Sequence, residues 1–232
     1  MTAETDAKSP AERLLDAAVM HVPFDGWSES TLRAAITDSG IDETMARSLY
    51  PRGGVDLALA YHRRGDDLMR QKLSTTDLSA LRYRDRIATA VRLRLEAIDD
   101  KEAVRRGTTL FALPPYALEG ARAIWGTSDA IWTALGDTSR DINWYTKRTT
   151  LAAVYSSTVL FWLGDDSTDH HDTWNFLDRR IDDVMQIEKA KAALRENPLS
   201  KVLLAGPMKL MDKIRKTDSP DDLPGKVKDR FF

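Results

Sequence analysis

Residues 141–163 read DINWYTKRTTLAAVYSSTVLFWL, and the character of this stretch changes part of the way along. Residues 149–163 carry no charge, and apolar or small residues occur all round the helical wheel, which is typical of a helix buried on every side. At about 1.5 Å per residue they reach only ~22 Å, short of the ~30 Å hydrocarbon core of a membrane. We therefore expect a central helix of a soluble domain.

The other half of the stretch carries polar and charged residues. Trp144 is followed three and four residues later by Lys147 and Arg148, and residues at this spacing share one face of a helix. An indole flanked by two cations predicts a contact surface at this end of the helix.

Composition bounds the class of protein. The chain has 232 residues, of which 42% are hydrophobic and 30% charged, enough for one sizeable core with or without a small appendage. The absence of cysteine excludes disulfides, thiolate nucleophiles and cysteine-ligated metal sites. Residues 1–10 hold two acidic residues and no apolar run, which fits neither a secretion signal nor a transit peptide. We therefore expect a cytoplasmic protein.

Charge is unevenly distributed along the chain. Residues 1–70 contain eight Lys/Arg and twelve Asp/Glu, a net charge of −4, whereas residues 195–216 contain six and two, a net charge of +4. An acidic N-terminal region is thus joined to a basic C-terminal segment.

The periodicity of apolar residues predicts an all-α fold, because no stretch shows sustained strand-type alternation. Ser9 and Glu12 form a capping box with Pro10 at the first helical position, and Pro23 and Gly26 are expected to end the first helix. Helices are predicted over about 10–22, 28–40, 42–50, 54–72, 77–98, 101–113, 115–135, 141–163 and 168–190, followed by a last helix over about 198–216 and a loose tail.

The first helices have the layout of a helix-turn-helix, with a tight turn at Gly40. The helix expected to read the DNA bases, 42–50, begins with two acidic residues, and Arg47 is its one residue of a type that commonly contacts bases. Most non-specific DNA affinity comes from cations that neutralise phosphates, of which this helix has only Arg47. This motif therefore looks degenerate, and we expect no nucleic-acid binding. A DNA-binding regulator with an apolar ligand stays as the alternative.

Residues 165–172, DDSTDHHD, crowd ionisable groups together but lack the spacing of a metal-binding motif, so a helix cap is favoured over a metal site. His21 and His62 are lone histidines on helices, more often packing residues than catalysts. The chain has no G-x-S-x-G, P-loop or G-x-G-x-x-G motif. We expect no metal, no cofactor and no catalysis. An enzyme in its own right stays as a second alternative, for which turnover by the purified chain without a partner would be needed.

The last predicted helix is amphipathic and basic. Its apolar residues fall within one arc, and its cations fall largely outside it. The apolar set is Leu199, Leu203, Leu204, Leu210, Met211 and Ile214, and the cations include Lys201, Lys209 and Lys216. Such a helix either lies in a membrane interface or docks on its own domain or a partner subunit, although Pro207 should kink it.

Residues 9–72 resemble the tetracycline-repressor class of regulators, in which a helix-turn-helix precedes a helical, dimeric ligand-binding domain. A longer resemblance covers most of residues 9–190 and points to the coenzyme Q biosynthesis family known as protein nine. The segments that carry it are RLLDAAVMHVPFDGWSESTLRAA (13–35), SLYPRGGVDLALAYH (48–62), GDTSRDINWYTKRTTLAAVYSSTVLFW (136–162) and DTWNFLDRRIDDVM (172–185).

The resemblance implies a repressor-like homodimer that no longer acts on DNA and holds isoprenoid quinone intermediates in an apolar pocket. It implies presentation of this lipid to the di-iron demethoxyubiquinone hydroxylase through a patch at Trp144, with Tyr145, Lys147 and Arg148 beside it. It also implies a membrane-associating C-terminal helix. With no targeting peptide expected, the predicted location is the bacterial cytoplasm, peripheral to the inner membrane.

The expected organisation is a disordered N-terminus (1–8), a degenerate helix-turn-helix region (9–72), a lipid-binding and dimerisation domain (73–193), a membrane-associating helix (194–216) and a flexible tail (217–232). Aromatic residues and methionine are plentiful in the later helices, where they form either an ordinary core or the lipid pocket that the resemblance implies. The residues predicted to bind the lipid are Trp125, Trp132, Tyr155, Phe161, Trp162, Trp174 and Met185.

Overall fold

The computed structural model describes residues 8–98 and 100–196. This part of the chain contains no strand, which confirms the all-α prediction. Its helices are α1 (Pro10–Asp25), α2 (Glu29–Ser39), α3 (Glu43–Leu49), α4 (Gly54–Thr75), α5 (Tyr83–Glu96), α6 (Lys101–Ala112), α7 (Ala117–Ala134), α8 (Ile142–Leu163), a 3-10 turn η1 (Thr168–His170), and α9 (His171–Glu196).

Local sequence signals set the first helix boundaries. The Ser9 hydroxyl accepts a hydrogen bond from the Glu12 amide, and the Glu12 carboxylate accepts one from the Ser9 amide, so the capping box is confirmed. Gly40 ends α2 in the left-handed conformation, at φ +63°, which favours glycine. Asp42 then caps α3, and α2, Gly40 and α3 form the expected helix-turn-helix.

Three predicted boundaries were wrong. Helix α1 runs through Pro23 to Asp25, because a proline so close to the helix end removes only one late hydrogen bond, and Gly26, at φ +66°, stops it instead. Helix α5 begins at Tyr83 rather than near 77, since the Asp77 carboxylate accepts the Ser79 amide and holds a turn there. Helix α9 ends at Glu196 rather than near 190.

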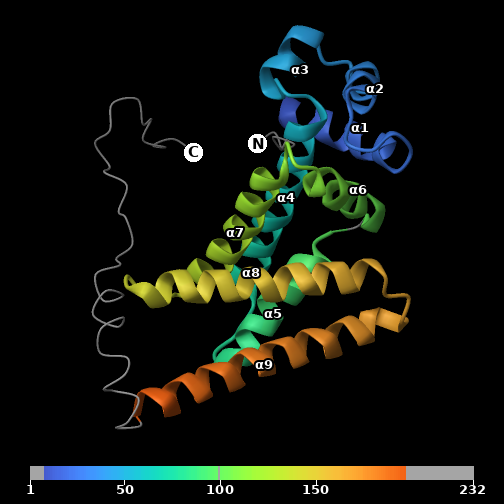
Figure 1. The fold of residues 1–232 in the computed structure, drawn as a ribbon. Coiled ribbons are helices and arrows are strands. Elements are labelled where there is room, and N and C mark those ends of the chain that lie inside the picture. The colour runs from blue at the N-terminus through green and yellow to red at the C-terminus, as the bar shows by residue number, and fades with distance from the viewer. Residues whose placement is uncertain (1–7, 99, 197–232) are drawn as a thin grey trace, which may run out of the picture.

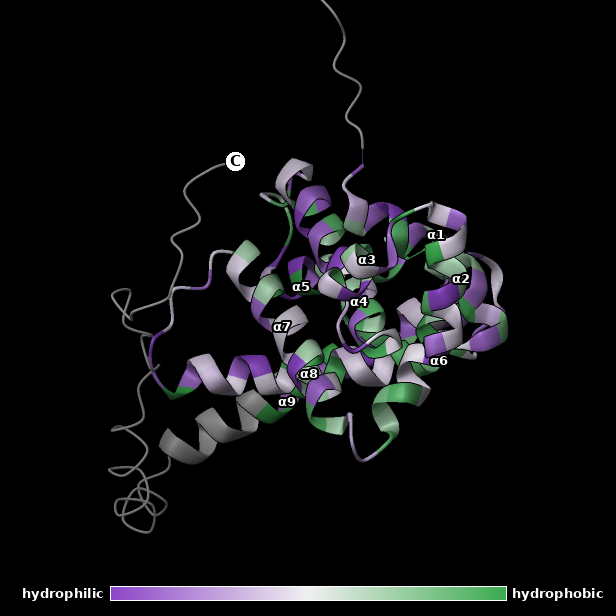
Figure 2. Cartoon of the chain, turned by 90° about the horizontal axis from the view of Figure 1, so that it is seen from above, coloured by the Kyte–Doolittle hydropathy of each residue, from purple (hydrophilic) through white to green (hydrophobic). Residues whose placement is uncertain are grey.

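The helices form two packed groups (Figure 1). Helices α1, α2 and α3 make a small N-terminal lobe, with a core that also takes in Ala103 of α6. Helices α4, α5, α7, α8 and α9 share the main core, in which α8 and α9 pack together across α7 and α5. Hydrophobic and hydrophilic residues alternate along the helices, as expected for amphipathic helices around a common core (Figure 2).

Helix α8 is not buried on every side, contrary to the prediction. Leu151, Tyr155 and Trp162 are buried, but Leu160 is 60% exposed and Phe161 is 37% exposed. The reason is that α7 and α6 cover one side of α8 and α9 covers another, which leaves a third face open. Its apolar sequence therefore reflects both a core and an uncovered surface.

No helix in residues 8–98 and 100–196 combines the length and hydrophobicity that a membrane span requires. This agrees with the sequence prediction that the apolar part of α8 is too short to span a membrane.

Candidate functional site

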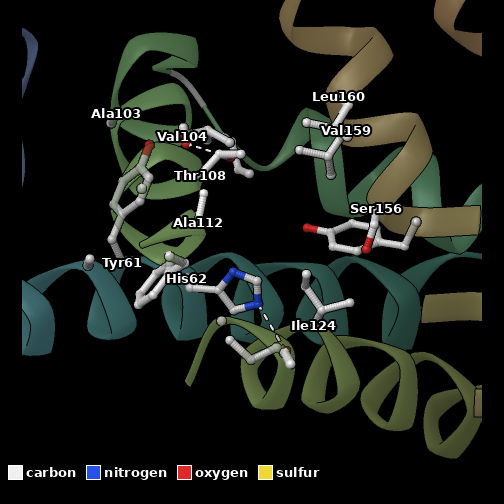
Figure 3. A pocket seen from close by; sticks show the side chains of 18 of the residues that line it. Tyr61, His62, Ala103, Val104, Thr108, Ala112, Ile124, Ser156, Val159 and Leu160 are labelled. Carbon is white, nitrogen blue, oxygen red and sulfur yellow. Dashed lines mark hydrogen bonds between the residues drawn. The ribbon is translucent and has the colours of Figure 1, made fainter. Parts of the chain in front are cut away.

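A cavity of about 380 Å³ lies between α4, α6, α7 and α8 (Figure 3). Its walls are mainly apolar. Helix α4 contributes Ala58, Tyr61 and His62, α6 contributes Ala103, Val104, Gly107, Thr108, Phe111 and Ala112, α7 contributes Ala117, Gly120, Ala121, Ala123 and Ile124, and α8 contributes Tyr155, Ser156, Val159 and Leu160; Trp27, Arg94 and Ile98 complete the lining. A cavity of this volume and character falls within the usual range for small-molecule sites.

Small residues on α6 and α7 create this space. Gly107 follows Ala103 by one helical turn on α6, so neither position fills the gap between the helices. Gly120 lets the two helices approach closely, because a Cβ atom there would lie 2.6 Å from the Cβ of Phe111. Helices α6 and α7 are thus in close contact at Phe111 and Gly120, whereas the small residues Ala103 and Gly107 leave an open space between the helices.

The mouth of the cavity is apolar. Ala112, Ala117, Ala121 and Leu160 line the cavity and are also exposed to solvent. The neighbouring exposed side chains Leu113 and Leu118, 48% and 62% exposed, extend this character along the turn between α6 and α7. An apolar chain could therefore leave the cavity without crossing a charged rim.

His62 is a polar side chain of the cavity wall. Its Nε2 atom lies 2.8 Å from Thr127 Oγ1 and 3.2 Å from the carbonyl oxygen of Ala123. Burial, reinforced by the nearby Arg94 guanidinium, lowers the pKa of the ring to about 4. The ring is therefore neutral at pH 7.

A buried ion pair lies behind the cavity wall. Arg94 is 1% exposed, and its Nε donates to Asp66 Oδ1 at 2.6 Å while an Nη atom donates to the carbonyl oxygen of His62 at 2.9 Å. Gly65 makes room for this guanidinium, because a Cβ atom there would lie 2.3 Å from Arg94 Nη1. Tyr155 packs beside the pair, and burial raises the pKa of its phenol.

The structure scatters the residues predicted to bind lipid. Tyr155 lines the main cavity, whereas Trp132 and Met185 line a second, smaller cavity of about 210 Å³ between α5, α8 and α9. The others lie in neither: Trp125 packs near Trp144, Phe161 stacks on Phe176, Trp162 lies under Lys101, and Trp174 lies under Arg92. The structure therefore joins these seven side chains in no single site.

Sequence reasoning missed most of the main cavity because it looked for aromatic residues. The usable signal was the recurrence of alanine and glycine on one face of α6 and of α7. The sequence predicted a packing role for His62, and its hydrogen bond to Thr127 fits that role. Its ring also faces the cavity (Figure 3).

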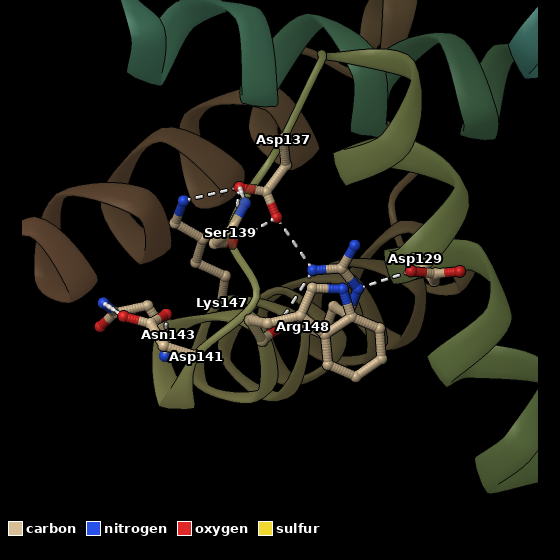
Figure 4. A network of polar contacts seen from close by, with 8 residues as sticks. Asp129, Asp137, Ser139, Asp141, Asn143, Lys147 and Arg148 are labelled. Atoms are coloured by element: carbon tan, nitrogen blue, oxygen red, sulfur yellow. Dashed lines mark hydrogen bonds and ion pairs between the residues drawn. The ribbon is translucent and has the colours of Figure 1, made fainter. Parts of the chain in front are cut away.

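The residues of the NWYTKR segment gather at the start of α8, beside the turn after α7 (Figure 4). Asp137, whose side chain is 2% exposed, accepts hydrogen bonds from Lys147 at 2.8 Å and from Arg148 at 3.0 Å. Arg148 also donates to Asp129 at 2.5 Å, and its guanidinium lies 4.1 Å from the ring centre of Trp144. The segment thus links α8 to α7 and to the turn that follows α7 through ion pairs.

The placement of Arg148 differs from the expected surface cation. Its side chain is 2% exposed, because the buried carboxylate of Asp137 draws the guanidinium inward. Lys147 is partly exposed, and Trp144 and Tyr145 are half-buried with their rings 4.7 Å apart. Of the four residues predicted to contact a partner, Arg148 is therefore buried, and it packs against the inner face of the Trp144 ring.

The acidic cluster before α9 acts as a cap, as favoured from sequence. Asp165 accepts hydrogen bonds from the backbone amides of Ser167 and Thr173 and from the Thr173 hydroxyl. Burial opposes ionisation of this carboxyl, but these hydrogen bonds outweigh it and hold its pKa well below the ordinary value. Within the described residues, no cluster of histidine and acidic side chains is arranged to hold a metal ion.

The predicted membrane-binding set lies outside the described residues. It comprises Leu199, Lys201, Leu203, Leu204, Lys209, Leu210, Met211, Ile214 and Lys216. The amphipathic helix therefore stays a prediction.

The arrangement of helices, with a helix-turn-helix lobe before a helical body, is that of a tetracycline-repressor-like protein. A solved structure of a TetR transcriptional regulator from Nitrosomonas europaea ATCC 19718 superposes with a TM-score of 0.61 and 20% sequence identity, over 74% of this chain and 95% of that one. At this identity the likeness establishes the fold alone.

The resemblance to the coenzyme Q biosynthesis family is confirmed: the chain is a homologue of the COQ9 proteins. The COQ9 family model matches residues 117–188, which span α7, α8 and most of α9. A probable ubiquinone biosynthesis protein coq9, mitochondrial, of Dictyostelium discoideum is 30% identical over 79% of this chain and 62% of its own length. The mitochondrial ubiquinone biosynthesis proteins COQ9 of Drosophila melanogaster and Homo sapiens are 31% and 30% identical, over 76% and 75% of this chain. The chain spans 55% and 57% of their lengths.

Proposed function

We propose that this protein is a non-catalytic accessory factor of ubiquinone biosynthesis that binds an isoprenoid quinone intermediate in the cavity between α4, α6, α7 and α8. The observation that carries the proposal is the cavity itself, apolar in its walls and at its mouth. The homology to proteins named for ubiquinone biosynthesis supports this class of ligand.

The physical chemistry of the ligand fits this site. A polyprenyl tail resists leaving a bilayer by about 0.8 kcal/mol for each buried methylene, so a carrier must offer an equally apolar environment. A volume of about 380 Å³ suits a ring and the first part of a tail. The rest of the tail would leave through the mouth beside Leu160, toward a membrane surface. On this proposal the protein works in the bacterial cytoplasm, peripheral to the inner membrane, with its C-terminal segment as the membrane contact.

A leucine at position 107 tests the site. Gly107 lines the cavity within α6, and a Cβ atom there meets only Trp27, at an ordinary 3.5 Å, so Gly107→Leu should fill space without breaking the helix. Removing a mid-helix glycine should also stabilise α6 by about 0.5–1 kcal/mol. We expect mass spectrometry of solvent extracts to find isoprenoid lipid in the wild-type protein and at least about a tenfold loss in this variant, which corresponds to about 1.4 kcal/mol of binding free energy.

Gly126→Leu is the matched control. Gly126 is exposed on α7, a Cβ atom there meets nothing within 4 Å, and the residue is no part of the cavity lining. This variant should keep the wild-type lipid content. Equal lipid loss in both variants, or equal retention in both, would contradict the assignment of the ligand to this cavity.

The surface around Trp144 is the proposed docking site for the di-iron hydroxylase. Trp144 lies half-buried over Arg148, next to Trp125 and Tyr145, and a rigid aromatic group with a cation beneath it is typical of an interface anchor. Trp144→Ala should weaken the complex with the hydroxylase by at least about tenfold, measured by calorimetric titration. Trp144→Phe keeps an aromatic ring over the Arg148 guanidinium, so its affinity for the hydroxylase should fall less than that of Trp144→Ala. Wild-type affinity in Trp144→Ala would remove the docking proposal.

The homodimer implied by the resemblance stays a prediction. So does the alternative of a DNA-binding regulator, which the repressor-like fold favours. Against it, Arg47 of α3 is held by Glu29 at 2.7 Å and by Glu43 at 3.0 Å, so this cation is already paired within the lobe. Tight, salt-sensitive binding to a DNA palindrome would decide for the regulator.

A further inference from the structure

One nitrogen of the His62 ring has no hydrogen-bond partner among the described residues. Nε2 is occupied by Thr127 and Ala123, whereas Nδ1, the other ring nitrogen, has neither a hydrogen bond nor a fully buried position. Figure 3 shows this second nitrogen directed away from the hydrogen-bonded side, toward the open centre of the cavity. A polar atom thus faces a mainly apolar space.

The surrounding hydrogen bonds determine which nitrogen carries the proton. The carbonyl oxygen of Ala123, 3.2 Å from Nε2, can only accept, so Nε2 must donate. Thr127 agrees with this, because its hydroxyl donates to Asp66 Oδ1 at 2.9 Å and is left to accept from Nε2 at 2.8 Å. In the neutral ring, Nδ1 is therefore a lone-pair acceptor.

Two other polar atoms of the wall are also acceptors. The hydroxyl of Ser156 donates to the carbonyl oxygen of Ala152 at 2.8 Å, and that of Thr108 donates to the carbonyl oxygen of Val104 at 3.0 Å. Each proton is used within its own helix, so the oxygen lone pairs remain for a ligand. The donors of Arg94 are directed elsewhere, to Asp66, to the His62 carbonyl and against Gly65. The phenol hydroxyls of Tyr61 and Tyr155, which also line the cavity, can donate as well as accept, but neither changes the acceptor role of His62 Nδ1.

We propose that His62 Nδ1 accepts a hydrogen bond from an O–H group of the ligand, so that the cavity prefers a phenol or hydroquinone head group to its O-methylated or oxidised form. This inference rests on the proposed function and refines it, since it specifies that the isoprenoid quinone intermediate is bound in its reduced, hydroquinone form. A quinone ring carries only acceptor oxygens and would leave Nδ1 unpaired in an apolar cavity, which opposes binding. His62 is thus a specificity-determining residue.

A pair of probes that differ only in the donor tests the inference. We would titrate the full chain with 4-heptylphenol and with 4-heptylanisole, its methyl ether, and follow the fluorescence of Trp27 and the other tryptophans. Because the probes differ by one hydrogen bond to an acceptor that the bound ligand would cover, the phenol should bind the wild-type protein about five- to tenfold more tightly than the ether.

Two variants separate the acceptor from the structural role of the ring. His62→Gln can place its amide N–H near the Nε2 position, keeping the bonds to Thr127 and Ala123, but leaves no acceptor at the Nδ1 position. It should bind both probes equally. His62→Asn can place an acceptor near Nδ1 and should retain a preference for the phenol. Thermal melts of both variants confirm that each is folded.

The outcomes distinguish this inference from the function it rests on. Equal affinity of the two probes for the wild-type protein, or an unchanged preference in folded His62→Gln, overturns the role of His62 and leaves lipid binding in place. Binding of neither probe overturns the proposed function, and the inference with it.

Discussion

Asp66→Ala should lower the free energy of unfolding by about 3–5 kcal/mol, because it leaves the buried guanidinium of Arg94 without its counterion. Arg94 is 1% exposed, and its Nη1 already lacks a partner among the described residues. The remaining bond to the His62 carbonyl cannot replace a carboxylate 2.6 Å from Nε. The same change also removes the acceptor of the Thr127 hydroxyl, on which the orientation of His62 depends.

Asp67→Ala is the matched control, since Asp67 is the next residue of α4 and pairs with Arg70 on the surface. Exposed ion pairs of this kind contribute about 0–1 kcal/mol. Urea denaturation of the two variants measures the difference. The double variant Asp66→Ala/Arg94→Met should recover part of the loss, because it removes the uncompensated charge. A loss below about 1 kcal/mol in Asp66→Ala would show that water or another group reaches Arg94.

Arg148→Met should have the second large effect, a loss of about 3 kcal/mol in the free energy of unfolding. It removes a buried cation that joins Asp129 of α7, Asp137 of the following turn and the face of Trp144. Lys147 still pairs with Asp137 in this variant, which keeps the expected loss at the lower end of the range for buried pairs. Lys147→Met should cost less, about 1 kcal/mol, because Lys147 is partly exposed and Arg148 remains.

The pH dependence of this loss identifies its source. Burial opposes ionisation of Asp137, but hydrogen bonds from Lys147, Ser139 and Arg148 outweigh it and hold the pKa of the carboxyl well below its ordinary 3.8. A lowered pKa contributes stability above pH 3.8 that is lost as the pH falls through the folded-state value. The gap between wild type and Arg148→Met should therefore be full near pH 7 and narrow below pH 3.8. If the difference in unfolding free energy between wild type and Arg148→Met were the same near pH 7 and below pH 3.8, the lost stability would come from packing alone.

Sequence alone predicted the helices well where local chemistry decides the structure. The capping box at Ser9, the glycine at position 40 and the cap at Asp42 each satisfy backbone groups within a few residues, so their signals are contained in the sequence itself. Prediction was poorer where two local options competed. At Asp77, for example, a side-chain hydrogen bond to Ser79 displaced the start of α5.

The candidate site was less predictable because a cavity is a property of packing between helices. Aromatic residues suggested a pocket, yet Trp162 fills the core and Phe161 lies on the surface. The space comes instead from small residues such as Gly107 on α6 and Ala121 on α7, and their effect depends on how closely Gly120 lets the two helices approach. The inward turn of Arg148 likewise required the position of Asp137, which no periodicity reveals.

The most direct test of the central proposal is a crystal structure of the full chain purified with its native lipid. We expect ring and tail density in the cavity between α4, α6, α7 and α8, with the ring beside His62 and the tail leaving past Leu160. Lipid density in the second cavity, beside Trp132 and Met185, with the main cavity filled by side chains or water, would contradict it.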